Sequence, residues 1–498
     1  MGADRVFAAV LGGGPAGATA ARLLAAWGHD VILLTRPSVR PALAESLPPS
    51  ALHALDRVGV GRLVVDAGFV RSTGNTVWWG GDAPRVEMFP EGTFGLQVER
   101  RRFDEILLDA VAGARVWRDA SVRDVASAGP DTAQRIIRFE REGTVHEVRA
   151  DWVLDCSGRA GVVARHGMRV SEQSPRTTAL AVAWETESWE LPDWTHTTVE
   201  SAASGWAWSI PVSPSRRYVA VMLDPRQSPI PGAANVPDRY ARALQQFPRH
   251  GALTGTAGTH QTGDVVAVDA TSYHSASPAM PGVILAGDAA SFVDPLASFG
   301  IKKAVSAAWL ASVVVHTAVK TPGLTQAALD LYTEWERSTT AMLRQGALAF
   351  AVAAHLDDRR RVDEDYWGAR AAADPIEDSG LDVRQLRDDV DVKSALEFLR
   401  EASGHLALRW APGCERVQRP LVRDNLVVME AHLTTPRLST PVRFLRNVDL
   451  IALADTAIQH ADVPDILDAY NRRHPAVPLA DLLGALAVLC GKRVLEHA

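Results

Sequence analysis

The run Gly12-Gly13-Gly14-Pro15-Ala16-Gly17 constrains the fold of this chain more than any other stretch of its sequence. The apolar residues from Arg5 to Leu11 before it are typical of a buried strand. An alanine-rich helix is predicted after it, to about Trp27, and residues 31–34 form a second short apolar segment. This order predicts a strand–turn–helix–strand unit, the context in which the spacing G-x-G-x-x-G has a specific meaning.

Within that unit, the glycines predict a dinucleotide-binding turn. Gly12 permits the tight turn, Gly14 lets the backbone approach a pyrophosphate, and Gly17 lets the helix pack closely on the strand. The pyrophosphate would accept hydrogen bonds from free amide groups at the helix N-terminus. Where an acid usually binds the ribose, the chain has Thr35 and Arg36. We expect Thr35 to hydrogen-bond a hydroxyl and Arg36 to face a phosphate.

Composition sets the broad class of the protein. Its 498 residues exceed a typical single core, so two or three folding units are expected. A net charge of -7 argues against a nucleic-acid-binding surface. The three cysteines (Cys156, Cys414 and Cys490) form no disulfide framework, and no Cys-x-x-Cys pair offers a metal site. Because no signal-peptide layout and no apolar run of ~18 residues occurs, we expect a cytoplasmic protein without a membrane span.

Two further strand–turn–helix segments indicate which dinucleotide is bound. The first is "DWVLDCSGRAGVVAR" at residues 151–165, and the second is "PGVILAGDAASFVDPLASFGIKKA" at residues 281–304. An aspartate after a strand, beside a glycine and a helix start, suits a polyol hydroxyl such as that of the flavin ribityl chain. Residues 295–300 supply backbone amides at a helix N-terminus, which suit the electron-rich edge of an isoalloxazine or an anion.

The remaining patterns complete a prediction of the fold as an α/β chain. Alternating apolar and polar residues near 170–225 predict antiparallel strands, and from about Ala304 the spacing becomes helical. We expect a discontinuous Rossmann-like FAD-binding domain at residues 1–170 and 265–320, with an inserted antiparallel β-sheet substrate domain at residues 171–264. A mostly helical C-terminal region of unknown role occupies residues 321–498.

Together these stretches resemble a known family. Six stretches are similar to those of FAD-dependent monooxygenases of the para-hydroxybenzoate hydroxylase type. They are Gly12 to Gly17, "ESLPPS" from Glu45, "QVERRRFDEILLDA" from Gln97, "LDCSGRAGVVAR" from Leu154, "GWAWSIP" from Gly205 and "GDAASFVDPLASFG" from Gly287. Within that class, the Trp-x-Trp-x-Ile-Pro pattern resembles the flavin-dependent halogenases. The resemblance covers roughly residues 5–350.

The resemblance implies FAD as the cofactor and assigns roles to individual positions. Arg100 would contact FAD, Asp288 would contact the ribityl chain, and the loop Pro295–Gly300, which includes Ser298, would contact the flavin ring. Trp206 and Trp208 would line the wall between flavin and substrate, because two indoles on one strand face make a rigid, dry partition. Glu45 and Ser72 would also line the substrate cavity.

One family residue is missing. Halogenases carry a lysine that receives or hydrogen-bonds hypohalous acid, and its position in "GFVRSTGNTVWWG" (residues 68–80) falls on Ser72, with Arg71 beside it. The first lysine of the chain is Lys302. Arginine stays protonated and cannot act as a tunable amine. The glutamate that tryptophan halogenases carry in the flavin loop falls on Ala297, and phenol and pyrrole halogenases also lack it.

The sequence therefore predicts a monooxygenase that hydroxylates an electron-rich aromatic, such as an indole, free or bound to a peptide or carrier, through a flavin C4a-hydroperoxide. The alternatives are a halogenase with displaced catalytic groups, a reductase of the geranylgeranyl-reductase kind, and a non-enzymatic carrier-binding or maturation protein. No second G-x-G-x-x-G unit is evident, so a separate flavin reductase is the expected electron donor. Acid–base candidates near the motifs are not ranked: Glu45, His53, Arg71, Asp294, Tyr273 and His274.

Overall fold

The computed structural model describes residues 4–36, 43–81, 83–171, 175–226, 235–297, 299–357, 366–371, 386, 388–401 and 406–497. The chain divides into two compact units, Met1–Ile376 and Glu377–Ala498. The boundary predicted at residue 321 falls inside the first unit. The division of residues 1–320 into a discontinuous FAD-binding domain and an inserted substrate domain stays a prediction.

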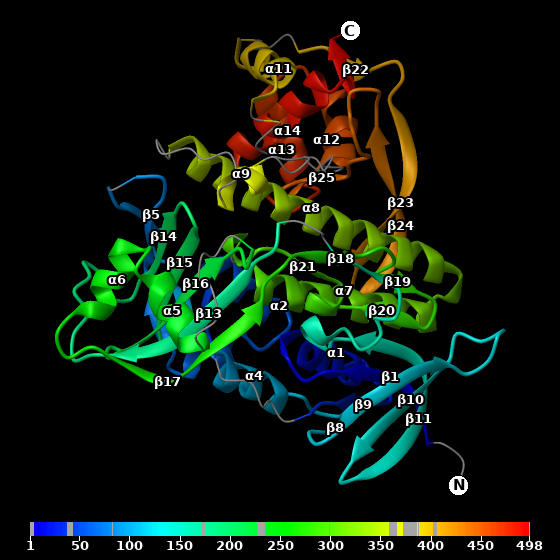
Figure 1. The fold of residues 1–498 in the computed structure, drawn as a ribbon. Helices are drawn as coiled ribbons and strands as arrows, with labels where there is room; N and C mark the ends of the chain where they lie inside the picture. The colour runs from blue at the N-terminus through cyan, green and yellow to red at the C-terminus, as the bar shows by residue number, and fades with distance from the viewer. Residues whose placement is uncertain are drawn as a thin grey trace. The chain divides into compact units, whose positions relative to one another are not determined.

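A mostly parallel sheet underlies the first unit (Figure 1). Its order is β19 (Ala279–Met280), β20 (Val283–Leu285), β11 (Thr144–Asp155), β1 (Asp4–Leu11), β2 (Val31–Leu34) and β8 (Arg115–Trp117). Along this order all pairs except β19–β20 are parallel, and β10 and β9 join the same sheet through antiparallel pairs. Helix α1 (Pro15–Ala26) joins β1 to β2, so the strand–turn–helix–strand unit predicted from the glycine run is confirmed.

The apolar runs form strands because this sheet is covered on both faces. All four residues of β2 are buried. β11 is long enough to pair with β1 through its second half and with β10 (Arg135–Arg141) along most of its length, and β10 pairs in turn with β9 (Ser121–Ser127). Ile137 and Phe139 of β10 pack against the same apolar cluster as Leu11 and Ile32.

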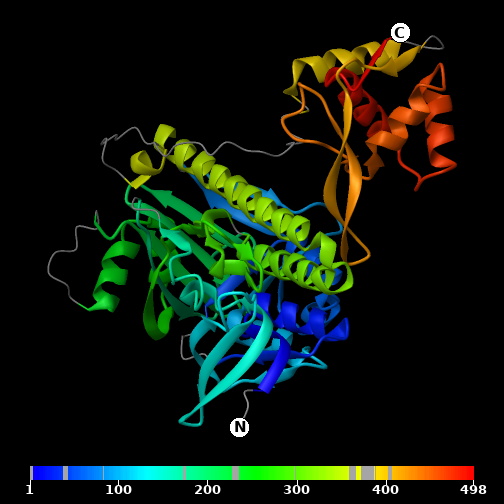
Figure 2. The same ribbon diagram turned by 90° about the vertical axis from the view of Figure 1, so that its right-hand side faces the viewer.

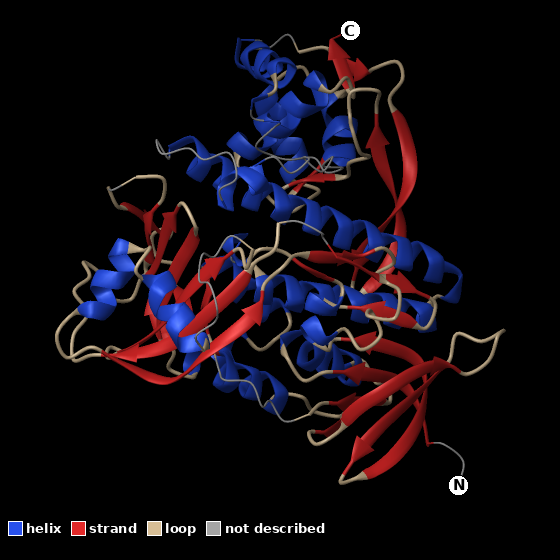
Figure 3. Cartoon of the chain, viewed as in Figure 1, coloured by secondary structure: helices blue, strands red, loops and turns tan. Residues whose placement is uncertain are grey.

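A second sheet carries the paired tryptophans (Figure 3). Its order is β17 (His260–Asp269), β13 (Thr178–Glu185), β16 (Arg216–Leu223), β15 (Gly205–Pro211), β14 (Thr197–Ala202), β5 (Gly74–Trp78) and β6 (Arg85–Met88). The predicted antiparallel strands near residues 170–225 are confirmed. β5 and β6, from residues 74–88, extend the sheet through a parallel β14–β5 pair that the sequence did not indicate.

Helices cover both faces of this second sheet. On one face, α5 (Val236–Leu244) contributes Tyr240 and Leu244 to a cluster with Val219 and Val221 of β16. On the other face, α8 (Thr325–Asp357) and α9 (Tyr366–Ala371) pack against Trp206. α8 also packs along α7 (Gly300–Lys320), which packs on α1 (Figure 2). The sheet face that carries Trp206 also packs against Phe292 and Leu296, at and just before the predicted flavin loop.

Two small sheets position the loops around the predicted site. One has the order β3 (Ala44–Leu47), β7 (Gly95–Glu99), β4 (Val70–Ser72), and the other β12 (Arg169–Ser171), β18 (Tyr273–Ser275), β21 (Ser291–Phe292). The remaining elements of the unit are α2 (Pro49–Arg57), α3 (Gly61–Asp66), α4 (Arg100–Asp109), α6 (Pro248–Gly255) and the 3-10 turns η1 (Gly158–Ala160), η2 (Gly287–Ala289), η3 (Pro295–Ala297) and η4 (Pro322–Leu324).

The second unit has its own core around α14, with Leu482, Leu486 and Leu489 buried. Its helices are α11 (Val390–Glu401), α12 (Leu450–Ala457), α13 (Val463–Asn471) and α14 (Leu479–Gly491), and its strands are β22 (Leu408–Trp410), β23 (Glu415–Arg423), β24 (Leu426–Thr434), β25 (Phe444–Leu445), β26 (Val448–Asp449) and β27 (Leu495–His497). The long hairpin β23–β24 makes this unit a mixed module in which helices supply most of the core.

Candidate functional site

The glycine turn between β1 and α1 has the geometry that its spacing predicts. Gly12 has φ +105°, and a Cβ there would lie 2.4 Å from the carbonyl oxygen of Cys156. A Cβ on Gly17 would lie 1.8 Å from the Gly12 oxygen, so strand and helix approach too closely for any side chain. Gly14 instead faces open space, because a Cβ added there would meet no atom within 4 Å. The first turn of α1, which includes Pro15 and Ala16, holds no acidic residue.

The end of β2 lies against this turn. A Cβ on Gly13 would lie 2.8 Å from Oγ1 of Thr35, so the Thr35 side chain closes one side of the turn. Oγ1 of Thr35 donates to the Arg36 carbonyl oxygen at 3.4 Å, and Arg36 itself is exposed. The structure therefore places Thr35 beside the backbone that would bind the dinucleotide, and Arg36 at its edge.

The second motif forms a closed loop at the end of β11. Asp155 is fully buried, and its Oδ1 accepts hydrogen bonds from the amide and hydroxyl of Ser157 at 3.1 and 2.5 Å. Its Oδ2 accepts from the amides of Val163 and Ala164 at 2.7 and 3.2 Å. With both oxygens occupied, Asp155 holds the loop in shape and has little capacity left for a ligand.

The third motif meets the glycine turn at η2. A Cβ on Gly287 would lie 3.3 Å from the Cβ atoms of Ala16 and Ala304, so η2 touches both α1 and α7. Beneath it, Lys303 donates from Nζ to the carbonyl oxygens of Gly287 and Ser291 at 3.2 and 2.8 Å and pairs with Glu336 at 2.9 Å. This buried lysine fixes the turn that presents Asp288.

The Asp288 carboxylate lies among titratable groups that come from three other segments. Its charge raises the pKa values of Glu45 and Tyr273, in each case adding to a larger effect of burial. Its charge also opposes the burial that lowers the pKa of Arg159. Asp288 is half-buried, and among the described residues no hydrogen bond to its carboxylate is found. Its side chain is therefore available to a ligand hydroxyl.

Glu45 and Arg100 form an ion pair on the other side of this region. Nη1 of Arg100 lies 2.7 Å from Oε2 of Glu45, and Nε lies 3.2 Å from Oδ1 of Asp104. Burial alone would lower the pKa of Arg100, but the two carboxylates raise it above its usual value. A Cβ on Gly300 would lie 3.2 Å from Oε1 of Glu45. Glu45 therefore reaches the start of α7 and brings Arg100 toward the flavin loop.

Trp206 and Trp208 lie in an apolar cluster with Phe292, which precedes the predicted flavin loop, and Leu296, which belongs to it. Trp206 is 2% exposed and Trp208 is partly buried. The cluster also takes in Trp79 and two residues of α9, Tyr366 and Trp367. Nε1 of Trp79 donates to the Phe350 oxygen at 2.9 Å, and Nε1 of Trp367 donates to the Ala202 oxygen at 2.7 Å. The paired indoles are thus one wall of an aromatic cluster beside the flavin loop.

Asp294 interacts electrostatically with Tyr366 of this cluster. It precedes η3, and its Oδ1 accepts a hydrogen bond from the amide of Leu296 at 3.1 Å. Burial raises its pKa above the usual value, against the opposing effects of that amide and of Arg370. Its charge in turn raises the pKa of Tyr366, after the larger effect of burial. Asp294 therefore lies within electrostatic reach of the aromatic cluster.

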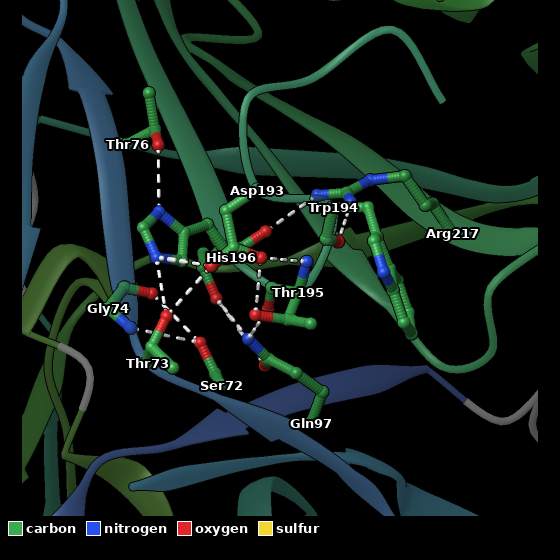
Figure 4. Close-up of polar contacts among 11 residues, drawn as sticks. Ser72, Thr73, Gly74, Thr76, Gln97, Asp193, Trp194, Thr195, His196 and Arg217 are labelled. Carbon is green, nitrogen blue, oxygen red and sulfur yellow. Dashed lines mark hydrogen bonds and ion pairs between the residues drawn. The ribbon is translucent and has the colours of Figure 1, made fainter. Parts of the chain in front are cut away.

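Ser72, at the position of the halogenase lysine, is 1% exposed and donates to the Gly74 carbonyl oxygen at 2.9 Å. Figure 4 shows it beside a polar network that contains Thr73, Gln97 and His196. Oγ1 of Thr73 lies 3.0 Å from Nε2 of His196 and donates to Asp193 at 2.8 Å. Burial lowers the pKa of His196 despite the nearby Asp193. Ser72 thus lies in a closed polar environment.

Among the other sequence candidates, the Tyr273 ring lies 6.0 Å from that of Phe292, a member of the aromatic cluster. Arg71 is exposed and lies over the Phe94 ring at 4.4 Å, and His53 is exposed on α2. Tyr273 donates to the Asp288 carbonyl oxygen at 2.7 Å, next to the predicted ribityl position, while His274 is partly buried in the same strand. Pro295 begins η3 and Gly300 begins α7. Ser298, and the side chain of Ala297, lie outside the described residues.

Sequence reasoning missed Arg159 and the aromatic pair of α9. The Arg159 guanidinium lies 4.0 Å from the Phe292 ring centroid and 5.3 Å from that of Tyr273, and burial lowers its pKa. Its position in the quoted stretch "LDCSGRAGVVAR" was the available signal. Tyr366 and Trp367 come from a stretch rich in charged residues, "RRRVDEDYWGAR", which gives no indication of a buried aromatic pair.

Residues 5–341 match the protein family described as FAD binding domain. Since this match covers more than half of the chain, the protein belongs to that flavoprotein family, and its cofactor is FAD. The residues present fit this cofactor, because Gly14 leaves open space at the N-terminus of α1 and the Asp288 carboxylate is available nearby. The predicted α/β fold and cofactor are confirmed.

Within this class, the chain is a halogenase-like FAD-dependent oxidoreductase of the para-hydroxybenzoate hydroxylase superfamily. It is 27% identical over 421 residues to a tryptophan 2-halogenase from Chondromyces crocatus, covering 82% of this chain and 78% of that protein. The fold matches the flavin-dependent halogenase CmlS with a TM-score of 0.77 and 22% identity, covering 100% of this chain and 96% of that chain. It also matches QhpG, a peptidyl tryptophan dihydroxylase essential for tryptophylquinone cofactor biogenesis, with a TM-score of 0.67 and 22% identity, covering 98% and 99%.

No helix among the described residues is long and apolar enough to span a bilayer.

Proposed function

We propose that the protein is an FAD-dependent monooxygenase that hydroxylates an electron-rich aromatic substrate, and that it does not halogenate. The observation that carries the proposal is the state of Ser72, a 1% exposed hydroxyl bonded to the Gly74 oxygen where halogenases have a lysine. A serine there offers no amine to receive or direct hypohalous acid.

The five lysines of the chain support the same conclusion. Lys303 is buried against Glu336, and Lys302 lies with its Nζ 4.8 Å from the Phe299 ring on α7. Lys320 ends α7, near His29 and His316. In the second unit, Lys393 pairs with Asp388 at 3.4 Å and Lys492 pairs with Asp389 at 2.5 Å. None of these contacts involves Ser72, Trp206 or Trp208.

The chain's own residues would hold the cofactor at two places. The first-turn amides of α1, at the open side of Gly14, would donate to the pyrophosphate. The Asp288 carboxylate would accept from a ribityl hydroxyl, and the amides from Pro295 to Gly300 would face the flavin ring. When reduced in the presence of dioxygen, FAD supplies an electrophilic oxygen atom for such a hydroxylation.

The aromatic cluster would receive the substrate and exclude water from it. Trp208, which is partly buried, would offer a flat apolar surface on which an aromatic ring stacks, and the buried Trp206 would pack beside it. The Asp294 carboxyl, whose pKa burial raises, would accept the ring proton that an electrophilic substitution releases. Arg159 over the Phe292 ring holds a fixed positive charge between η1 and β21.

The relatives guide the choice of substrate. The likeness to a tryptophan halogenase and to a peptidyl tryptophan dihydroxylase favours an indole, either free or within a peptide or carrier-bound molecule. A separate flavin reductase would deliver the electrons, and a cytoplasmic location is part of the same proposal.

Mass spectrometry of the products tests the proposal. FAD-loaded enzyme is photoreduced, mixed with dioxygen and bromide, and given a panel of indoles, phenols and tryptophan-containing peptides. We expect products heavier by one oxygen atom, with label incorporated from ¹⁸O₂ and none from water. A brominated product would refute the proposal, and loss of bromination in Lys302→Met would then identify that lysine as a displaced catalytic amine. Substrate turnover without dioxygen would instead indicate a reductase.

A further inference from the structure

A surface pocket of about 330 Å³ lies between α2 and α7. Its walls combine basic, hydroxyl and apolar side chains with one indole. The lining residues are Ser50, His53, Ala54, Arg57, Val58, Lys302, Val305, Ser306 and Trp309. The two helices pack directly against each other, so the pocket has a fixed frame.

The ionisable side chains that line this pocket are all basic. His53 and Arg57 lie one turn apart on α2, and Lys302 approaches from the first turn of α7. No carboxylate belongs to the lining, in a chain whose net charge is -7. Among the described residues, none of the three basic side chains forms an ion pair. Burial lowers the pKa of Lys302, as expected for an ammonium without a counterion.

The walls of the pocket suit an organic anion more than a simple salt ion. The Arg57 guanidinium lies 4.6 Å from the Trp309 ring centroid, which holds its planar fork at the edge of the pocket. Ser50 and Ser306 add hydroxyl donors, and Val58 and Val305 supply apolar surface. Planar guanidinium donors beside a lysine ammonium are the groups that proteins use to bind phosphate.

We propose that this pocket binds the phosphate group of an organic phosphate, with Arg57, Lys302 and His53 as its donors and Trp309 beside the organic part. Two molecules that a flavin monooxygenase can meet carry such a group: a reductant with a 2′-phosphate, NADPH, and the phosphopantetheine arm of a carrier-bound substrate. The shared phosphate chemistry is the proposal, and the experiment distinguishes the two sources.

The pocket is separate from the predicted FAD site, because α7 presents different faces to each. Lys303 and Ala304 face Gly287 of the third flavin motif, whereas Lys302 and Val305 line the pocket toward α2. The inference therefore does not depend on whether the enzyme transfers oxygen or halogen.

Isothermal titration calorimetry on the FAD-loaded full chain tests the inference. The probes are inorganic pyrophosphate, NADP⁺ against NAD⁺, and 4′-phosphopantetheine against pantetheine. The variants are Arg57→Gln and Lys302→Gln. The control is Arg62→Gln on α3, an exposed arginine that already pairs with Asp66 at 3.4 Å.

We expect a phosphate-bearing probe to bind more tightly than its phosphate-free match. Each pocket variant should raise the Kd of that probe about tenfold, because it removes one charge-assisted hydrogen bond. Arg62→Gln should leave the Kd unchanged. A preference for NADP⁺ would assign the pocket to the reductant, and a preference for phosphopantetheine to the carrier. Failure of every probe to bind at millimolar concentration, or equal affinity in Arg57→Gln and Lys302→Gln, would overturn the inference.

Discussion

Replacement of Gly14 by alanine separates cofactor binding from folding. Gly14 has φ -76° and ψ -171°, a conformation that alanine adopts without strain, and no atom lies within 4 Å of the added methyl group. At a helix N-cap, alanine is less favourable than glycine by about 0.5 kcal/mol, so the folding cost is small. The methyl group would, however, occupy the space in which a pyrophosphate approaches the amides of α1. Loss of one hydrogen bond to a charged group costs about 1.5–3 kcal/mol, which predicts FAD affinity lower by about 10- to 150-fold.

The assay is a fluorescence titration of deflavinated protein with FAD, together with the melting temperature of each variant. Gly17→Ala is the contrasting change, because its Cβ would lie 1.8 Å from the Gly12 oxygen and must displace the turn. We expect that variant to lose about 1–3 kcal/mol of folding stability or more. Gly346→Ala, inside α8 with no atom within 4 Å, should keep the wild-type affinity. Wild-type FAD affinity in Gly14→Ala would refute the placement of the pyrophosphate.

Three other changes probe separate parts of the molecule. Trp208→Ala should open the wall beside the predicted flavin loop, so the ratio of hydrogen peroxide to hydroxylated product formed from the consumed dioxygen should rise. An unchanged ratio would contradict the role of Trp208 as part of that wall. Asp294→Asn should lower kcat about 10- to 100-fold and remove the acidic limb of the pH–rate profile, whereas exposed Asp264→Asn should leave both unchanged. Burial, His316 and Lys320 lower the pKa of His29 from 6.5 to about 4. Between these values only the unfolded chain binds the proton, so stability falls as the pH falls, by about 1 kcal/mol after solvent screening. Denaturant titrations at pH 7.5 and 4.5 should show that His29→Phe removes this loss of folding stability. An unchanged loss would contradict its assignment to His29.

Local patterns predicted the nucleotide-binding part of the fold well. The turn at residues 12–17 depends on a backbone conformation at Gly12 that favours glycine, so its spacing between a buried strand and a helix identifies it. The same holds for η2, where Gly287 has φ +66°. The physical reason for such a motif lies in the backbone conformation of a few neighbouring residues.

Long-range pairings could not be predicted in the same way. Ser72 was expected to line the substrate cavity, a role that no contact of the structure tests. Its polar surroundings depend on His196, which pairs with Thr76 across 120 positions of the chain. Tyr366 and Trp367 reach the Trp206 cluster from a segment whose neighbours are charged. No period in the sequence connects such residues, because their contacts follow from the docking of whole elements.

Few atoms of the candidate site would distinguish an enzyme that transfers oxygen from one that halogenates. The glycine turn, Asp288 and the paired indoles are compatible with either reaction, since their predicted roles are to bind the cofactor and to exclude water. A halogenase needs in addition an ammonium group on the substrate side, and a buried ammonium is stable only with a counterion or hydrogen-bond acceptors. Lys303 has such partners in Glu336 and two carbonyl oxygens, which tie it to the third flavin motif. Around Ser72, the Gly74 oxygen accepts from the serine hydroxyl and the Asp193 carboxylate accepts from Thr73, so these acceptors already have hydrogen-bond donors.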